Sequence, residues 1–272
     1  MEKAQGIVAD EIVLDLEDSV APSEKSAALD AVRNALANWT GPPTAVRVNR
    51  PGTPWCHHEL IALAEMRRPP RSVVVPKVET AADLAFVDRL LDGVQAARPD
   101  ATPLRLQALI ESAAGLAAIH EIAAASPRLE ALIIGYADLA VSLGRPPSGP
   151  RNPDLWLASQ DAVLVAARAH NLQAIDGPFL STIDDEPFRY ACARARDLGF
   201  DGKWAIHPSQ VGALNELFTP SDTEIAHARL VIETLAVSEA EGSGAAALHG
   251  EMLDDAVRRA ALRVLSRAGA SA

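Results

Sequence analysis

The chain has 272 residues, of which 49% are hydrophobic and only 4% aromatic, and its formal net charge is −11. This length suits one α/β barrel of about 250 residues, with a core built from Ala, Val, Leu and Ile. The acidic balance and the lack of a Lys/Arg-rich block argue against a nucleic-acid partner, and no signal peptide or membrane-spanning apolar run is visible.

Short apolar runs recur along the chain, and an Ala-rich helical pattern follows most of them. Continuous apolar runs of this kind are typical of parallel strands that are buried on both faces. Seven such runs begin at residues 11, 45, 72, 104, 131, 173 and 203. The clearest helical segments between them are 81–95, 112–125, 154–170 and 184–199. This rhythm predicts a TIM (β/α)8 barrel, with a doubly wound open sheet as the alternative.

The two ends of the chain depart from this rhythm. Residues 1–9 resemble the end of a helix, so we expect the first strand of the barrel to be missing from this chain. We expect a catalytic barrel over residues 1–220 and a C-terminal helical extension over residues 221–272. Within the extension, residues 238–250 look small and flexible, which predicts either a linker before a terminal helix or a hinged lid or swapped arm.

Polar side chains follow the predicted strands at the points where the strands end. In a parallel barrel these ends gather at one mouth, where active sites lie. The groups are Asp15, Glu17 and Asp18, then Arg47 and Asn49, Lys77 and Glu79, Glu111, Asp138, Asp176, and finally Lys203 with His207. So many polar groups at one mouth favour an active site over isolated structural roles.

Glu111 and Asp138 are the best candidate metal ligands. Each follows an apolar run, and their strands are adjacent in the predicted order. Protein sites commonly hold Mg²⁺ by one or two carboxylates together with water and substrate oxygens. The alternative is that one of the two caps the helix that follows it, since both lie at a predicted helix start.

Arg47 lies on a predicted strand, where an unpaired guanidinium is costly to bury. Its planar fork suits a carboxylate or a developing oxyanion. A compatible alternative is an ion pair with the acids of the preceding strand. We expect Asp15, Glu17 and Asp18 to orient Arg47, Lys77 and water near the metal ion, with at least one of the three acids purely structural.

The histidines and cysteines carry weaker signals. A lone histidine such as His207 is more often a packed or hydrogen-bonding core residue than a catalyst, and His57–His58 lacks a ligand partner at convincing spacing. Cys56 and Cys192 are far apart, which predicts reduced thiols in a cytoplasmic protein. The sequence has no GxGxxG, P-loop or GxSxG motif, which argues against nucleotide-binding and serine-hydrolase functions.

A series of motifs then identifies a family resemblance over nearly the whole chain. In order they read VLDLEDSVAPSEK, VRVN, VVVPKVE, LIESAAGL, GYADLAVSLG, AIDGPF, GFDGKWAIHPSQ and GEMLDD. They resemble the citrate lyase β-subunit-like proteins, which are CoA-ester lyases of the HpcH/HpaI aldolase superfamily. The resemblance implies a TIM barrel, a homotrimer or a multiple of it, and one Mg²⁺ per site on Glu111 and Asp138.

The resemblance also implies a reaction. A 3-hydroxyacyl-CoA such as malyl-CoA, citramalyl-CoA or citryl-CoA is cleaved into a 2-oxo acid and an acyl-CoA. The reverse reaction forms the 3-hydroxyacyl-CoA from these two compounds. Arg47 faces the substrate's carbonyl or enolate oxygen, and Glu111 contacts substrate through the metal. Asp254 is the candidate acid/base and acts on a neighbouring subunit's site. The alternatives are a metal-dependent aldolase of free 2-oxo acids and a citrate lyase β subunit that depends on partners.

Two departures from the family pattern are visible. Family members usually begin with a strand that carries an Arg and a V-P-G turn, which helps to hold CoA, and this chain lacks it. Tyr136-Ala137 stands where many members have Ala-Glu. We expect the second departure to alter the surroundings of the metal without removing it.

Overall fold

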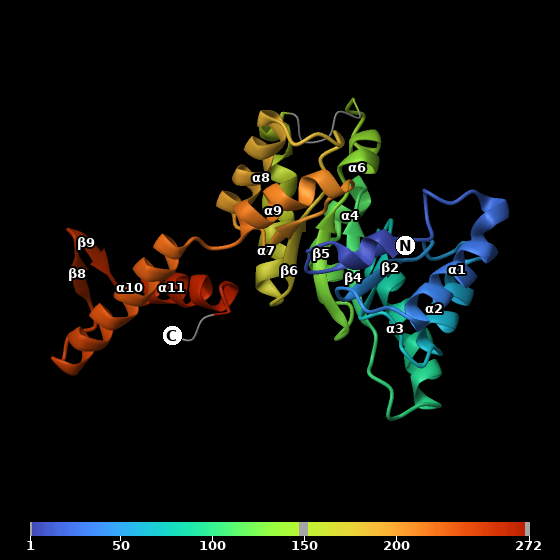
Figure 1. The fold of residues 1–272 in the computed structure, drawn as a ribbon, viewed down its shortest axis with the longest axis horizontal. Helices are drawn as coiled ribbons and strands as arrows, with labels where there is room; N and C mark the ends of the chain where they lie inside the picture. The colour runs from blue at the N-terminus through green and yellow to red at the C-terminus, as the bar shows by residue number, and fades with distance from the viewer. Residues whose placement is uncertain (1, 147–151, 270–272) are drawn as a thin grey trace. The chain divides into compact units, whose positions relative to one another are not determined.

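The computed structural model describes residues 2–146 and 152–269, and it divides the chain into two compact units, Met1–Leu214 and Asn215–Ala272. The first unit is built on a parallel sheet whose seven strands lie in sequence order (Figure 1). The strands are β1 (Ile12–Asp15), β2 (Thr44–Arg47), β3 (Ser72–Val75), β4 (Arg105–Ile110), β5 (Leu129–Ile134), β6 (Gln173–Asp176) and β7 (Gly202–Lys203).

The strand order decides between the two predicted architectures. A doubly wound sheet reverses its strand order near the middle, whereas here each strand pairs with the next one along the chain. The predicted fold class, a TIM-like barrel, is therefore confirmed, and the doubly wound alternative is wrong. All seven predicted strands are present.

The helices alternate with the strands. Their bounds are α1 (Lys25–Ala37), α2 (Cys56–Ala64), α3 (Ala81–Ala96), α4 (Ala113–Ala117), α5 (Ile119–Ala123), α6 (Tyr136–Ser142), α7 (Leu157–Ala169), α8 (Glu186–Leu198) and α9 (Val211–Phe218). Short 3-10 helices cover Glu2–Gly6, Pro22–Glu24, Pro153–Trp156 and Pro208–Gln210. Residues 2–6, where the end of a helix was expected, thus form a short 3-10 helix. None of the helices in the described residues is long and apolar enough to cross a membrane.

The pleat of the strands separates two faces of the sheet, because successive side chains point to opposite sides. We call one side the inner face, which is defined by a buried cluster of Ala45, Val74, Leu109 and Ile133 with Val13 and Ile175 packed against it. Asp15, Arg47 and Glu111 lie two residues beyond members of this cluster. They therefore belong to the same face, at the carboxyl ends of their strands.

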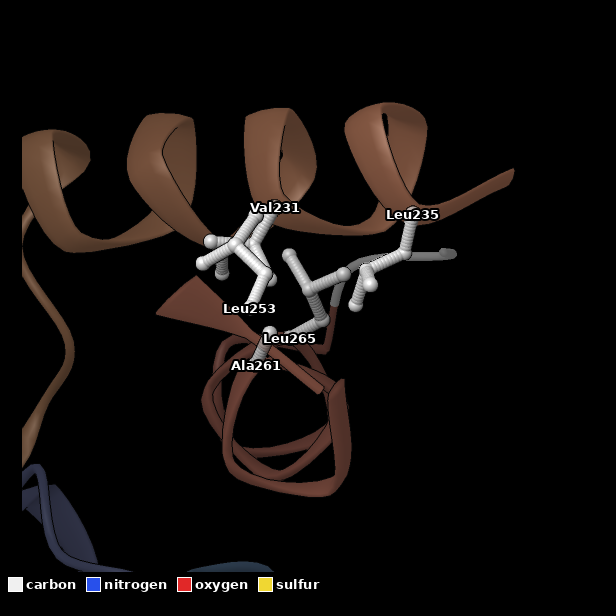
Figure 2. Close-up of a cluster of buried hydrophobic side chains, with 6 residues drawn as sticks. Val231, Leu235, Leu253, Ala261 and Leu265 are labelled. Atoms are coloured by element: carbon white, nitrogen blue, oxygen red, sulfur yellow. The ribbon is translucent and has the colours of Figure 1, made fainter. Parts of the chain in front are cut away.

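The second unit contains α10 (Asp222–Ala240), β8 (Ala246–Leu248), β9 (Glu251–Leu253) and α11 (Asp255–Arg267). Its core joins the two helices and the second strand (Figure 2), through Ala228, Val231, Leu235, Leu253, Ala261 and Leu265. A capping box between Ser221 and Glu224 starts α10.

Residues 238–250 are not a linker without secondary structure, because helix and strand cover part of the segment. Helix α10 continues to Ala240, and β8 pairs with β9 as an antiparallel hairpin. The two loop residues, His249 and Gly250, have φ values of 51° and 88°. Positive φ at both positions is what a two-residue type I′ turn requires. The sequence signal is weak because His-Gly is not one of the residue pairs that usually mark this turn.

Candidate active site

The carboxyl end of β1 is joined to the end of β2 by an ion pair that the strand register dictates. Asp15 and Arg47 are direct partners in the parallel pairing of these strands, so their side chains leave the same face. Arg47 donates from Nε and Nη2 to the two carboxylate oxygens of Asp15, each at 2.7 Å. Its Nη1 lies 3.2 Å from Oε2 of Glu17. The predicted pairing of Arg47 with the acids of the preceding strand is confirmed.

These contacts fix the charges of the pair. Burial alone would raise the pKa of Asp15, but the hydrogen bonds and positive charge of Arg47 outweigh it and hold that pKa at about 2. The pKa of Arg47 is raised in turn, because the acids around it outweigh the cost of its burial. A guanidinium carries five N–H donors, so donors remain beyond the two that bind Asp15.

Lys77 connects the acids of β1 to the metal-ligand candidates. Its Nζ lies 2.6 Å from Oε1 of Glu17, 3.3 Å from Asp18 and 3.6 Å from Oδ2 of Asp138. Its backbone N–H donates to Oε1 of Glu111 at 2.7 Å. Lys77 adopts φ of 51°, a left-handed conformation that costs a residue with a Cβ of order 1 kcal/mol or more. In this conformation the Nζ of Lys77 contacts Glu17, Asp18 and Asp138, and its backbone N–H contacts Glu111.

Glu111 is one of the two buried acids of this cluster, and like Glu17 it has 5% of its surface exposed. Burial, with the negative charges of Asp138 and Glu17, raises its pKa to about 8. The backbone of Gly135, at the end of β5, presses against it. A Cβ added at Gly135 would lie 2.6 Å from Cβ and 2.7 Å from Oε2 of Glu111. The neighbouring strand thus holds the Glu111 side chain in place.

Neither Glu111 nor Asp138 caps the helix that follows it, so the alternative prediction is wrong. Helix α4 is capped by Ser112, whose Oγ accepts from the backbone of Gly115 at 3.0 Å. Helix α6 begins after Gly135, and Asp138 is its third residue rather than its cap. The side chain of Asp138 is 43% exposed beside Lys77. Both carboxylates therefore remain available at the mouth.

The charge balance of this cluster fits a divalent cation. It contains two cations, Arg47 and Lys77, and five carboxylates, which are Asp15, Glu17, Asp18, Glu111 and Asp138. No group of three or more His, Cys, Asp or Glu side chains that could hold a metal occurs within residues 2–146 and 152–269. A cation on Glu111 and Asp138 would thus need its other ligands from water and substrate oxygens, as Mg²⁺ often does.

The loop after β1 is supported by residues that the sequence analysis did not single out. Nζ of the buried Lys25 donates to the carbonyl oxygens of Leu16 and Glu17 at 2.8 and 2.7 Å. Asn49, predicted at the mouth, is instead buried and bound to both oxygens of Glu59 at 2.6 and 2.7 Å. Glu59 lies three residues after Cys56 on the buried side of α2, and an acid on an apolar stripe is the signal that was available.

Asp176 and Lys203 do not join the mouth. They are direct partners in the pairing of β6 and β7, and they alternate with Ile175, so they belong to the face opposite the inner one. There Nζ of Lys203 donates to Asp176, and the hydroxyl of Tyr136 also binds Asp176. Burial and the charge of Asp176 raise the pKa of Tyr136 well above its ordinary value.

The remaining polar candidates lie apart from the cluster. Glu79 is exposed before α3, and His207 is exposed and accepts from the backbone of Ser209. His57 and His58 lie in the first turn of α2. Cys56 and Cys192 are buried, and burial raises the pKa of each thiol to about 12.

Asp254 belongs to the second unit, where it precedes α11. Its Oδ1 accepts hydrogen bonds from the backbone N–H groups of Ala256 and Val257 at 2.9 and 3.1 Å. It is therefore the N-cap of the last helix. One oxygen of the carboxylate, Oδ2, takes no part in these two bonds.

Comparisons with known proteins agree with this geometry. The family model described as HpcH/HpaI aldolase/citrate lyase matches residues 1–208. The L-malyl-CoA/β-methylmalyl-CoA lyase of Rhodobacter capsulatus is 39% identical over 98% of this chain and 90% of its own length. A (3S)-malyl-CoA thioesterase of Cereibacter sphaeroides is 38% identical over the whole of this chain and 91% of its own length.

A solved structure is similar over almost the same span. The CitE protein of Mycobacterium tuberculosis, determined in complex with magnesium, acetoacetate and coenzyme A, is 34% identical to this chain. Its TM-score is 0.75, over 96% of this chain and 90% of that one.

Proposed function

The chain belongs to the HpcH/HpaI aldolase/citrate lyase family, and we propose that it is a Mg²⁺-dependent carbon–carbon lyase of 3-hydroxyacyl-CoA esters. The substrate class is that of malyl-CoA, β-methylmalyl-CoA, citramalyl-CoA and citryl-CoA. The products of cleavage are a 2-oxo acid and an acyl-CoA. The observation that carries the proposal is that Lys77 contacts both Glu111 and Asp138, at the same end of the sheet as Arg47.

The proposed roles follow from the chemistry of cleavage. A base removes the proton of the 3-hydroxyl group, the bond between the hydroxyl-bearing carbon and the carbon next to the thioester breaks, and its electron pair forms the enolate of the acyl-CoA. When bound by Glu111 and Asp138, Mg²⁺ supplies charge stabilisation and orientation for the oxygens of the 2-oxo acid. The free donors of Arg47 stabilise the enolate oxygen.

The acids of β1 have a supporting role in this scheme. Asp15 holds the guanidinium of Arg47 by two hydrogen bonds, so the guanidinium cannot rotate away from the substrate. Glu17 and Asp18 hold Nζ of Lys77, whose backbone N–H orients Glu111. We therefore interpret Lys77 as a residue that positions the metal ligand and not as a Schiff-base nucleophile.

Asp254 is the proposed acid/base, acting on the site of a neighbouring subunit in a homotrimer or a multiple of it. Asn caps helices about as well as Asp, so D254N should fold, bind Mg²⁺ normally and lose turnover. In mixed oligomers of D254N and E111Q, some sites would combine an intact Glu111 with an intact Asp254. Restored turnover in the mixture would support action between subunits, and unchanged turnover in D254N alone would exclude the acid/base role.

The direct test is a product assay on the four CoA esters with Mg²⁺ and with EDTA. Cleavage yields a 2-oxo acid and keeps the thioester, whereas hydrolysis yields free CoA thiol and keeps the hydroxy acid. Detecting the 2-oxo acid and the thiol in parallel separates a lyase from a thioesterase, which matters because one relative has the latter activity. Release of a 2-oxo acid that requires Mg²⁺ is the expected result.

The other outcomes point to other functions. Mg²⁺-dependent thiol release without a 2-oxo acid would identify a thioesterase. Inactivity on all four esters, combined with cleavage of free hydroxy-oxo acids, would identify an aldolase of free acids. Inactivity in both assays would favour a subunit that depends on acyl-carrier and transferase partners.

A further inference from the structure

A buried polar network lies behind the mouth, on the face of the sheet opposite the inner one. It joins the ends of three consecutive strands, since Tyr136 follows β5, Asp176 ends β6 and Lys203 ends β7. The Tyr136 hydroxyl donates to Oδ1 of Asp176 and accepts from Nε2 of Gln160, on α7, at 2.7 Å. Nζ of Lys203 donates to Oδ2 of Asp176.

This network is too deeply buried to contact substrate. The side chains of Lys203 and Asp176 are 0% and 1% exposed, and Tyr136 is fully buried against Trp156. Burying an ion pair is seldom favourable in itself, because the cost of desolvation can exceed the attraction. Replacing a buried ion pair by apolar side chains is often neutral or stabilising in proteins. We therefore ask which part of the structure the network positions.

What it holds is the start of α6. Tyr136 is the first residue of that helix, and Asp138 lies two residues further on. The preceding Gly135 donates its N–H to the carbonyl oxygen of Ile110 at 2.9 Å and presses on Glu111. On the other side, Gly177 leaves room for Tyr136, since a Cβ there would lie 2.1 Å from the carbonyl oxygen of Ile134 and 2.9 Å from Cδ2 of Tyr136.

We propose that the hydroxyl of Tyr136 is a positioning group that fixes the first turn of α6, and through it the placement of Asp138 relative to Glu111. This inference rests on the proposed role of these two acids as Mg²⁺ ligands. Gly135 sets the turn against Glu111, and the hydroxyl of Tyr136 ties the next residue to β6 and β7. Without the hydroxyl, only the packing of the Tyr136 ring against Trp156 and Gly177 holds the turn on that side. The side chain of Asp138 is 43% exposed, and within the described residues its ion pair is the one with Lys77 at 3.6 Å.

The test compares the two tyrosines of the chain. Y136F removes only the buried hydroxyl, and Y190F removes the hydroxyl of a tyrosine that is 59% exposed on α8. Mg²⁺ binding is measured by calorimetry on the intact apo-protein, and melting temperature is measured in EDTA. We expect Y136F to bind Mg²⁺ about tenfold more weakly, in line with other groups that orient metal ligands, and Y190F to match the wild type.

Activity gives a second readout. If the hydroxyl only positions Asp138, the loss of kcat/KM in Y136F should be largest at low Mg²⁺ and should diminish as Mg²⁺ is raised. A hydroxyl with a purely structural role would lower the melting temperature and leave the Mg²⁺ affinity unchanged. That combination would overturn the inference while leaving the metal site intact. A wild-type protein that does not bind Mg²⁺ would overturn the metal site as well.

A second variant keeps the test decisive if Y136F does not fold. Q160M removes the hydrogen bond that the Tyr136 hydroxyl accepts, and it leaves the Asp176–Lys203 pair intact. Weaker Mg²⁺ binding in Q160M than in the wild type is the expected result. Unchanged affinity in a folded Q160M protein would overturn the inference.

Discussion

Gly135 offers the sharpest test of how the two metal-ligand strands are packed. Its φ of −105° suits any residue, so only the space beside it explains the glycine. In G135A, the new Cβ would lie 2.6 Å from Cβ of Glu111, against an optimal separation of about 3.5–4.0 Å between carbon atoms. Glu111 is buried and cannot simply rotate away, so β4 and β5 must separate by roughly 1 Å.

Overpacking of this kind typically costs about 1–3 kcal/mol, and each kcal/mol lowers the melting temperature by roughly 2–4 °C in a protein of this size. The matched control is G93A on α3, where an added Cβ meets nothing within 4 Å. Replacing an exposed helical glycine by alanine should stabilise by about 0.5–1 kcal/mol. The two glycine-to-alanine changes are therefore expected to have opposite signs.

The assay is thermal unfolding in EDTA, followed by a Mg²⁺ titration of the folded protein. G135A should also bind Mg²⁺ at least about tenfold more weakly, because the Glu111 carboxylate is displaced, whereas G93A should bind it normally. A G135A protein as stable as the wild type, with unchanged Mg²⁺ affinity, would refute the packing argument.

Two further predictions concern the same site. E111Q and D138N should each abolish Mg²⁺ binding in calorimetry without unfolding the protein. The control E79Q changes an exposed acid outside the cluster and should bind Mg²⁺ normally. Retained binding in both E111Q and D138N would refute the assignment of these acids as metal ligands. In EDTA, the free energy of unfolding should fall as the pH rises from 4.5 to about 8, because the folded protein keeps a proton on Glu111 that the unfolded chain has released. In E111Q, the free energy of unfolding should fall less steeply over this pH range. The same pH dependence in E111Q as in the wild type would contradict the raised pKa of Glu111.

The sequence by itself determined the order of elements and the choice of site residues at the mouth. Seven short apolar runs are typical of strands that are buried on both faces, and so the seven strands of the parallel sheet were predictable. Residues directly after those strands must meet at one edge, which is why Arg47, Lys77 and Glu111 were found from position alone. The hairpin at His249–Gly250 was missed because local turn chemistry gave no strong signal there.

Only the tertiary structure decided which polar residues share a face. Asp176 and Glu111 both lie at the ends of apolar runs, yet Glu111 points into the mouth and Asp176 points to the opposite face of the sheet. The reason is that the pleat alternates and the strand ends shift by one residue. The same holds for Asn49, which turned inward to Glu59. The contact between Gly135 and Glu111, and the bond from Tyr136 to Asp176, join residues 24 and 40 positions apart. Such contacts exist only once neighbouring strands are in register, so no local pattern in the sequence encodes them.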